Sequence, residues 1–475
     1  MVMNKYLKLV IAAAFIFSLA ACRKDLLDPV PSDKISDKIA FATPERILGQ
    51  VHGMYQGVKD GRFLGGRGLI NNDVRAEEWL NVTTNGVTAF DAWNHTLNST
   101  SERVQQLWVF GYFAINRINV VLQGIQDNPD VIAPALANQY QAEGRFLRGV
   151  SYFYLVTLYG KKPFTADNGA SPGVPLRVNA ETTPANAHLA RSTVAEVYAQ
   201  ILADLDFAEA NLPLSYGAAN DTNTVRAHRN AAIAFKTRVY LNMGRYADVI
   251  TEANKIVPPT GPFVAPTGRA HRLEPTFLNV FRSPYTSPES IFSFPMTNTS
   301  GPGTQNGIAL YHNTEYELNP AAIIGDPSFT ATDARKTLVL VAAGRMRYTK
   351  FNSDNENYVP VIRYGEVLLN LAEALARTNE GVDTRALELL NAVRKRSDPT
   401  ITLTATNKQE LIDAILRERR LEMLGEGVRS MDILRLGIPI PAKGVVQAVP
   451  PDSKAYVFPI PQDELLYNNL MTTNE

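Results

Sequence analysis

The sequence predicts a mainly α-helical protein in which tetratricopeptide-like helix pairs pack against a loop-rich half. Three stretches of the chain, at about 102–159, 193–256 and 363–424, repeat apolar residues with the period of a helix. Two other stretches, at about 60–100 and 257–350, hold most of the clusters of Gly, Asn, Thr and Pro, which favour turns and loops. With 475 residues, of which 45% are hydrophobic, the chain can bury a large core.

The N-terminal residues predict export and attachment to lipid. Lys5 and Lys8 precede an apolar run at 9–21, which is too short to span a membrane and has the length of a secretory signal. The run ends in Leu-Ala-Ala-Cys, which resembles the bacterial lipobox, and Cys22 is the only cysteine of the chain. The alternative is an ordinary cleavage site that a cysteine follows by chance. We expect a signal peptide at 1–21, lipidation of Cys22, a leash at 22–37 and a folded body at 38–475.

Each helical stretch contains segments that should pack together. Trp108, Tyr112 and Ile115 recur at helical spacing and predict a helix at about 102–124. A second helix is expected at 135–159, and two helices so close in the sequence should pack as a hairpin. Further helices are expected at 193–210, 227–243, 248–256, 363–377, 384–396 and 408–424.

Composition and charge exclude several classes of function. The chain has 47 Lys and Arg against 47 Asp and Glu, and it has no long basic run that would neutralise the phosphates of a nucleic acid. One cysteine cannot form an internal disulfide or a thiolate zinc site, and the six histidines lack a metal-binding spacing. The sequence therefore predicts no nucleic-acid partner, no metal site and no cofactor.

Aromatic residues in the loop-rich stretches are candidates for ligand contact. Trp79 and Trp93 lie in polar loop sequence, whereas Trp108 lies on a helix face and is expected in the core. An aromatic ring that buries about 100 Å² of a sugar contributes about 2.5 kcal/mol, so several rings with polar neighbours are needed. The alternative is that each tryptophan pins its loop to the body of the protein. Expected polar contacts and cleft-closing residues are Asn71, Asn72, Asp73, Asp91, Asn94, Tyr311, His312 and Tyr316.

Charged residues on the predicted helices are expected to form ion pairs rather than an acid–base pair. Glu366 and Glu373 are seven residues apart and so share a helix face, and Arg363 and Arg419 belong to the same group of helices. A glycosidase would need two carboxylates brought together from distant positions, and we expect the protein not to be an enzyme. The candidates for such a pair would be Asp73, Glu77, Glu78 and Asp91.

Distinctive motifs lie in order along the chain at 108–119, 143–160, 363–374, 390–394, 418–422, 426–435 and 458–464. The motif at 363–374 reads Arg-Tyr-Gly-Glu-x-Leu-Leu-x-x-Ala-Glu-Ala. Together the motifs resemble those of the SusD/RagB family of outer-membrane nutrient-binding lipoproteins, and they cover almost the whole mature chain. The chain departs from the family pattern at Gly144, Gly149 and Gly365, where alanine is usual. A glycine inside a helix costs about 1 kcal/mol relative to alanine, so these positions are expected to weaken local helices.

The resemblance implies a SusD-like fold, with tetratricopeptide-type helix pairs on one side and a less regular ligand-binding half packed against them. It implies a lipid-anchored protein of the outer membrane that captures oligosaccharides and delivers them to a TonB-dependent, SusC-like barrel. The helical half is expected to contact that barrel, and catalysis is not part of the role. The alternatives are a peptide-binding, RagB-like uptake protein and an envelope scaffold without a small ligand.

Overall fold

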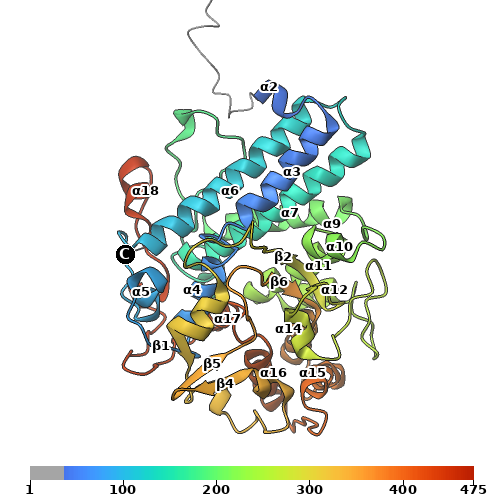
Figure 1. Ribbon diagram of the computed structural model, residues 1–475, viewed down its shortest axis with the longest axis vertical. Helices are drawn as coiled ribbons and strands as arrows, with labels where there is room; N and C mark the ends of the chain where they lie inside the picture. Colours follow the sequence, from blue (N-terminus) through green and yellow to red (C-terminus); the bar gives the residue numbers. More distant parts are fainter. Residues whose placement is uncertain (1–36, 475) are drawn as a thin grey trace, which may run out of the picture.

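The computed structural model describes residues 37–474, and these form the expected helical half and loop-rich half. At one end of the molecule three long helices lie side by side: α3 (Pro44–Val58), α6 (Glu102–Asp127) and α7 (Pro134–Tyr159) (Figure 1). Helices α6 and α7 pack against each other as the expected hairpin, and α3 packs against both. The short helix α2 (Asp37–Ala40) precedes α3.

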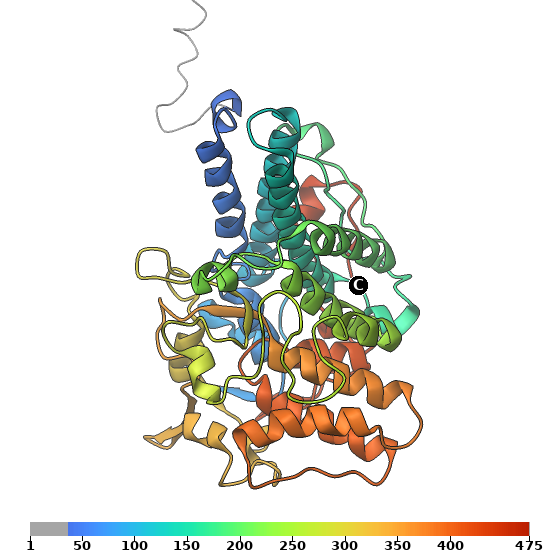
Figure 2. The same cartoon turned by 90° about the vertical axis from the view of Figure 1, so that its right-hand side faces the viewer.

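The remaining long helices continue this layer as a series of neighbouring pairs. Helix α9 packs between α7 and α11, and α11 packs on α12 and α14. Helix α14 packs on α15 and α16, which lie at the opposite end of the molecule from α3 (Figure 2). Stacked pairs of this kind bury a continuous core that no single pair could bury alone. Their bounds are α9 (Val194–Asn211), α11 (Arg229–Asn242), α12 (Tyr246–Ala253), α14 (Tyr364–Thr378), α15 (Thr384–Ser397) and α16 (Lys408–Glu422).

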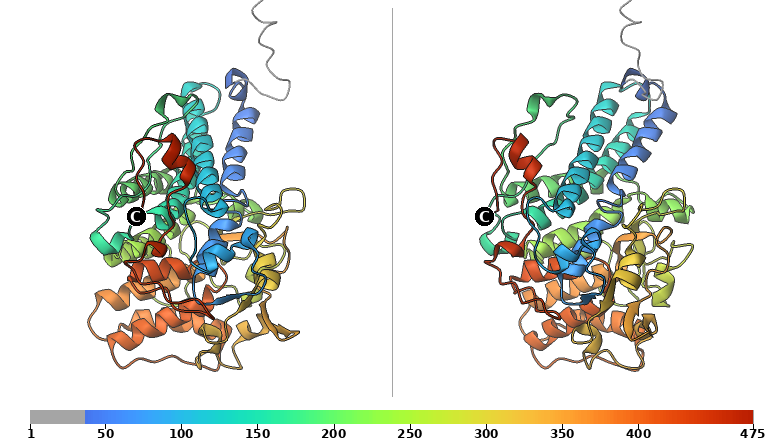
Figure 3. Two further views of the ribbon diagram at one scale, coloured as in Figure 1. Left: turned by 90° about the vertical axis from the view of Figure 1, so that its left-hand side faces the viewer. Right: turned by 60° about the vertical axis from the view of Figure 1, so that its left-hand side comes forward.

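Three two-stranded antiparallel sheets lie in the loop-rich half. The pairs are β1 with β3, β2 with β6 and β4 with β5. Because β1 pairs with β3, the segments near 60–100 and 300–320 lie next to one another although they are far apart in the sequence (Figure 3). The strands are β1 (Trp79–Asn81), β2 (Ser290–Phe294), β3 (Tyr316–Leu318), β4 (Val339–Ala342), β5 (Arg345–Tyr348) and β6 (Val359–Arg363).

The eight helices expected from the sequence are confirmed, with each end within three residues of its predicted position. Helices α3, α4 and α17 lie where no helix is expected, and α4 falls inside the stretch at 60–100 that predicts loops. Every residue of α4 is buried, including the polar residues Asn71, Asn72 and Asp73, so the polar residues of this short helix do not mark a side that faces solvent. The shorter helices are α4 (Arg67–Arg75), α5 (Phe90–Trp93), α8 (Phe164–Asp167), α10 (Asn220–Val225), α13 (Ile308–Leu310), α17 (Arg429–Leu436) and α18 (Gln462–Tyr467).

Capping residues explain where several helices begin. Thr193 and Glu196 form a capping box at the start of α9, in which each side chain satisfies a backbone N–H of the other residue. Asp383 accepts a hydrogen bond from the backbone of Ala386 and so caps α15. Asn407 caps α16 in the same way. Such side chains satisfy the N–H groups that have no partner inside the helix.

Close packing explains two of the glycines that depart from the family pattern. A β-carbon on Gly144 would lie 2.9 Å from a methyl group of Leu122 on the adjacent helix α6. A β-carbon on Gly365 would lie 2.8 Å from Arg363 and 2.9 Å from Glu289. The expectation that these glycines only weaken their helices is therefore incomplete, because the missing side chain lets neighbouring groups approach the helix.

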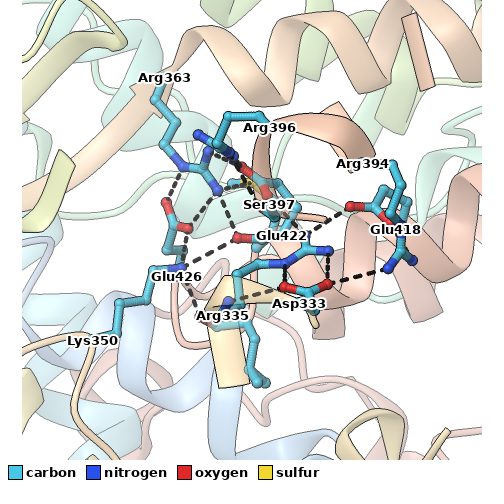
Figure 4. Close-up of polar contacts among 12 residues, drawn as sticks. Asp333, Arg335, Lys350, Arg363, Arg394, Arg396, Ser397, Glu418, Glu422 and Glu426 are labelled. Atoms are coloured by element: carbon cyan, nitrogen blue, oxygen red, sulfur yellow. Dashed lines mark hydrogen bonds and ion pairs between the residues drawn. The ribbon is translucent and has the colours of Figure 1, made fainter. Parts of the chain in front are cut away.

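Buried ion pairs connect the helices with the loop-rich half (Figure 4). The Arg363 guanidinium, at the end of β6, donates to Glu289 and to Glu422, with both distances 2.6 Å. Arg335 donates to the other oxygen of Glu422 at 2.9 Å, and Arg396 also contacts Glu422. A buried carboxylate that faces several guanidinium groups is well compensated, so this cluster joins five segments of the chain.

The predicted ion-paired seam between helices is also confirmed. Glu366 of α14 pairs with Arg238 of α11 at 2.5 Å. Glu373, two turns further along α14, pairs with Arg435 of α17 at 2.7 Å. These carboxylates are fully buried, and each is held by a guanidinium group from another helix. They therefore fix the relative positions of the helices.

Candidate ligand-binding site

The two aromatic residues Trp79 and His312, expected to contact ligand, lie in the core. Their rings stack on each other with centroids 4.2 Å apart and an angle of 8° between the planes. Both side chains have no exposed surface. The His312 Nε2 atom lies 3.4 Å from an oxygen of Asp73, whose pKa is raised by burial. Because a ring must expose a face to stack on a sugar, these side chains provide no binding platform in this structure.

Three more of the expected aromatic residues are buried and make structural contacts: Trp93, Tyr311 and Tyr316. The indole N–H of Trp93 donates to the backbone oxygen of Trp79, so Trp93 fastens α5 to β1. The rings of Tyr311 and Tyr316 stack 6.0 Å apart, and both are fully buried. The hydroxyl of Tyr316 donates to the backbone oxygen of Thr88 at 2.8 Å. The expectation that these rings close a cleft is corrected: they anchor loops to the body of the protein.

The polar residues expected beside these rings are mostly buried as well. Asn71 and Asn72 have no exposed surface, and the Asn72 amide donates to the backbone oxygen of Gly68 within α4. Asn94 and Asp91 are partly exposed near α5. The structure therefore brings most of the expected residues into one region, but that region is the core around α4 and β1.

Of the four carboxylates considered for a glycosidase, Asp73, Glu77 and Glu78 lie in ion pairs or in the core, and Asp91 is partly exposed. Glu77 lies 2.5 Å from Arg429, and Glu78 lies 2.7 Å from Arg420. Burial alone would raise the pKa of Glu77, but the Arg429 and Arg420 guanidinium groups hold it below its ordinary value. Burial, together with the nearby charge of Glu77, raises the pKa of Glu78. Glu77 and Glu78 are thus both engaged by arginine.

A polar cavity lies between the end of α3 and the loop that follows β2. Its volume is about 420 Å³, which falls within the range of about 300–1,000 Å³ that ligand sites occupy. One wall is formed by Gln56 and Lys59 of α3 and its following turn, and the other by the loop at 300–306. The second wall belongs to the loop-rich stretch at 257–350. Gly61 and Arg62 of the first wall belong to the loop-rich stretch at 60–100. The lining residues are Gln56, Lys59, Asp60, Gly61, Arg62, Ser300, Gly301, Pro302, Gly303, Thr304 and Asn306.

Hydrogen bonds hold the two walls of this cavity in place. The Lys59 ammonium donates to the backbone oxygens of Pro295 and Ser300 at 2.7 and 3.2 Å. The Arg67 guanidinium donates to the Asn306 side chain at 2.7 Å. Gly61 lies so close to the second wall that a β-carbon would be 1.8 Å from the Pro302 oxygen. The cavity is therefore formed before any ligand binds, which reduces the entropy lost on binding.

A partly exposed pair of tyrosines lies next to the same loop. The rings of Tyr285 and Tyr358 stack 4.7 Å apart with an angle of 17° between the planes. Asn357 donates to the Tyr285 hydroxyl at 3.3 Å. The adjacent residue Glu356 accepts a hydrogen bond from Asn298, just before the wall at 300–306. Burial raises the pKa of both tyrosines, so their hydroxyls stay protonated at neutral pH.

This arrangement combines the two kinds of contact that a sugar needs. The cavity offers amide, hydroxyl and charged groups to hydroxyls, and the tyrosine pair offers an aromatic surface. The sequence does not single out Tyr285 and Tyr358, because each is flanked by ordinary loop residues. The only available signal was that Tyr285 lies in a Pro-rich cluster, SPYTSP, within the loop-rich stretch.

Neither a cluster of metal ligands nor a membrane-spanning helix is found among residues 37–474. Within this range no three His, Cys, Asp or Glu side chains are grouped so that they could hold a metal ion. None of the helices in the same range is both long and apolar enough to cross a membrane. The predicted signal peptide, Cys22 and all of the predicted leash except Asp37 lie outside the described residues.

Comparisons with known proteins give the family of the chain. Residues 31–241 match a family model described as SusD-like, starch-binding associating with outer membrane, and residues 339–475 match the SusD family model. SusD-like protein P2 of Formosa agariphila is 26% identical over 446 residues, which cover 80% of this chain and 82% of the relative.

Solved structures agree with this assignment. A SusD superfamily protein from Bacteroides fragilis is 30% identical with a TM-score of 0.81, and the match covers 91% of this chain and 99% of the other. A laminarin-binding SusD-like protein has the same fold, with 22% identity, a TM-score of 0.70 and coverage of 91% and 99%. The helix pairs, the ordered motifs and these matches together show that the chain belongs to the SusD/RagB family.

Proposed function

We propose that this protein is a cell-surface lipoprotein that captures an oligosaccharide and delivers it to a TonB-dependent, SusC-like transporter of the outer membrane. The observation that carries the proposal is the preformed polar cavity of about 420 Å³ beside the partly exposed Tyr285–Tyr358 pair. A related protein of the same fold is named as laminarin-binding, and one matching family model is described as starch-binding. Glucans are therefore the first ligands to test.

Two stacked rings and a polar cavity suit a sugar chain better than a single sugar. Each ring that buries about 100 Å² of ligand contributes about 2.5 kcal/mol. Micromolar binding requires about 8 kcal/mol, so the rings alone do not supply it. Hydrogen bonds from groups such as Gln56 and Ser300 in the cavity would add to the stacking energy. An oligosaccharide that extends from the tyrosines into the cavity would use both.

The proposed role is binding without catalysis. Glu77 and Glu78 are held by Arg429 and Arg420, which leaves neither carboxylate free to exchange a proton with a glycosidic oxygen. The purified protein is expected to release no reducing sugar from the glycan that it binds. Bond cleavage would then belong to other proteins.

The proposed location depends on the N-terminal residues. Lipidation of Cys22 would hold the protein at the membrane, since several acyl chains give stable anchoring where a single chain gives only marginal binding. The leash at 22–37 would leave the body free to meet a transporter. Loss of the neighbouring transporter should therefore abolish glycan uptake, and unchanged uptake would contradict the delivery step.

The binding site can be tested by isothermal titration with laminarihexaose, maltohexaose and a pool of tryptic peptides. Saturable binding of a glucan is expected. The double variant Tyr285→Ala/Tyr358→Ala should weaken binding by more than tenfold, because both stacking surfaces are lost. Gln56→Ala should weaken it by a smaller factor, because it removes one polar contact. The matched control is Tyr467→Ala, which removes a tyrosine that is 75% exposed on α18.

The outcomes separate the alternatives. Equal glucan binding by the wild type and the double variant, with native circular dichroism spectra, would place the site elsewhere. Binding of peptides but not of glucans would favour the peptide-binding alternative. Absence of binding to either pool, together with copurification of several envelope proteins, would favour the scaffold alternative.

A further inference from the structure

A second cavity, away from the candidate ligand-binding site, combines positive charge with polar atoms that lack partners. Its volume is about 270 Å³, and it lies between residues 95–99, which follow α5, and the C-terminal segment. Both segments are on the side that faces the viewer in the left panel of Figure 3. The side chains that line the cavity from these two segments include His95, Lys454 and Asn474. None of the described lining residues is Asp or Glu.

The His95 imidazole is the clearest sign that this cavity takes a ligand. Both of its ring nitrogens are buried, and neither has a hydrogen-bond partner within the described residues. The Oδ1 atom of Asn474 is also buried without a partner, whereas its amide nitrogen donates to the backbone oxygens of Tyr159 and Phe458. Polar atoms in this state cost free energy unless something in the cavity pairs with them.

Two buried basic side chains lie close behind the wall, and burial, then the charge of Arg75, lowers the pKa of Lys443 well below its ordinary value of 10.5. The Arg75 guanidinium donates to the backbone oxygens of Ala455 and Tyr456, and Ala455 lines the cavity. The Lys443 ammonium donates to three backbone oxygens at the end of α4, those of residues 74–76. Among the described residues no ion pair to a carboxylate is found for either side chain. The acid with the clearest influence on Lys443 is Glu77, which is itself paired with Arg429.

The charge state of His95 follows from these neighbours. Burial, then the charges of Lys443 and Arg75, lower the pKa of His95 to about 2. The imidazole is therefore neutral at pH 7, with one nitrogen that donates and one that accepts. A ligand that satisfies it must accept one hydrogen bond and donate another. The surrounding positive field favours an acceptor that is anionic.

We propose that this cavity binds the anionic unit of a sugar, in which an oxyanion, a sulfate ester or a carboxylate, lies beside free hydroxyl groups. The oxyanion accepts from the imidazole N–H and lies in the field of Lys454 and Arg75. A hydroxyl group donates to the second imidazole nitrogen or to Asn474. A volume of about 270 Å³ is just below the range of about 300–1,000 Å³ for drug-sized ligands, so one sugar unit fits. The proposal does not depend on glucan binding at the tyrosine pair.

The test is isothermal titration of the full mature protein with glucose 6-sulfate, glucuronate, glucose and inorganic sulfate at constant ionic strength. At least one of the two anionic sugars should bind saturably, and glucose should bind at least tenfold more weakly. Saturable binding of inorganic sulfate as tight as that of the sugars would support the site and identify the free ion as an occupant. The imidazole signals of His95 in a histidine-labelled NMR spectrum should shift along the same titration curve.

Two charge-reversal variants with the same change in net charge test the location. Lys454→Glu, in the cavity lining, should weaken binding of the anionic sugar at least tenfold. Lys395→Glu, on an exposed part of α15, should change it by less than twofold. Both lysines are exposed, so neither change should unfold the protein.

Several results would overturn the proposal. Equal binding of glucose and glucose 6-sulfate would show that the charge is not recognised. Equal weakening by the two variants would reveal only a general effect of net charge. Failure of this test with intact glucan binding would leave the proposed function standing.

Discussion

Trp79 shows how burial decides the role of a residue whose sequence context is polar. The surrounding sequence, AEEWLNV, predicts a loop, and an exposed tryptophan in a loop could bind a sugar. In the folded chain two of these polar neighbours, Glu77 and Glu78, are paired with arginines, so they are buried together with the tryptophan. The local sequence could not reveal this, because Arg420 and Arg429 lie more than 300 residues further along the chain.

Gly61 gives a residue-scale prediction for the candidate ligand-binding site. A β-carbon there would lie 1.8 Å from the Pro302 oxygen, so Gly61→Ala must push the two cavity walls apart. We expect a loss of about 1–3 kcal/mol in the free energy of unfolding and at least tenfold weaker glucan binding. Urea unfolding and titration calorimetry measure the two effects.

The matched control is Gly49→Ala, on the exposed face of α3, where an added β-carbon meets nothing within 4 Å. Alanine is a better helix former than glycine, so Gly49→Ala should stabilise the protein by about 0.5–1 kcal/mol and leave glucan binding unchanged. If Gly61→Ala behaved like Gly49→Ala, the described contact between the two walls would be absent in solution.

At the scale of elements, the buried charge cluster around Glu422 determines how α16 is held. Glu422→Gln keeps the shape of the side chain but removes the charge that faces Arg335, Arg363 and Arg396. Removing one partner from a buried ion pair leaves uncompensated charge, so we expect a loss of about 3–5 kcal/mol in the free energy of unfolding. The exposed change Glu388→Gln on α15 should cost less than about 0.5 kcal/mol.

The same pair of variants gives a pH dependence with a definite sign. Burial alone would raise the pKa of Glu422, but the arginines hold it far below its ordinary value of 4.5. A carboxylate whose pKa is lowered by folding stabilises the protein above pH 4.5, and the stabilisation is lost as the pH falls below that value. The difference in unfolding free energy between wild type and Glu422→Gln should therefore shrink as the pH falls below 4.5. A difference that stays constant from pH 7 to pH 3 would show that folding does not lower the pKa of Glu422.

Helix pairs and loops could be predicted to different extents because they follow different rules. Helices α6, α7 and α14 carry apolar residues at helical spacing, which is a local property, and their bounds were predictable within a few residues. Helix α4 has only nine residues, and its polar residues Asn71, Asn72 and Asp73 are buried, so the same rule misses it. Polar residues inside a core are satisfied by partners that are distant in the sequence, and periodicity carries no information about those partners.

At the scale of the whole molecule, one continuous hydrophobic core runs through both halves. It includes Trp108 and Phe153 of the long helices as well as Phe292 and Phe351 of the loop-rich half. The helical half and the loop-rich half are therefore parts of one packed body rather than separately folded units. A ligand bound in the loop-rich half would be held by a scaffold that the helices make rigid.

Membrane attachment is a property of the whole protein that one residue should control. In Cys22→Ser the attachment point for lipid is missing, and no other cysteine can replace it. We expect the variant to appear in the soluble fraction, whereas the wild-type protein should appear with the outer membrane. Mass spectrometry of the wild-type protein should find residue 22 N-terminal and acylated. An unmodified residue 22 in membrane-bound protein would mean that something other than lipid holds it there.

Some features of the candidate site could be predicted from the local sequence, and others depend on contacts between distant residues. Composition predicted that ligand contacts would lie in the loop-rich stretches at 60–100 and 257–350. Residues from both stretches line the polar cavity. The aromatic residues with the strongest sequence signal, Trp79 and Trp93, are buried, whereas Tyr285 and Tyr358 form the partly exposed pair. Which ring faces solvent depends on how the loops pack, and that packing depends on contacts between residues far apart in the chain.

The sequence by itself determined the family, the helix pairs and the expected lipid anchor, since motif order, apolar spacing and the position of a single cysteine are properties of the linear chain. Only the tertiary structure decided which polar residues are buried, where the cavities lie and which rings are exposed. The physical reason is that burial and ion pairing depend on distances in space. Lys59, which closes one cavity by binding the oxygens of Pro295 and Ser300, meets partners more than 230 residues away.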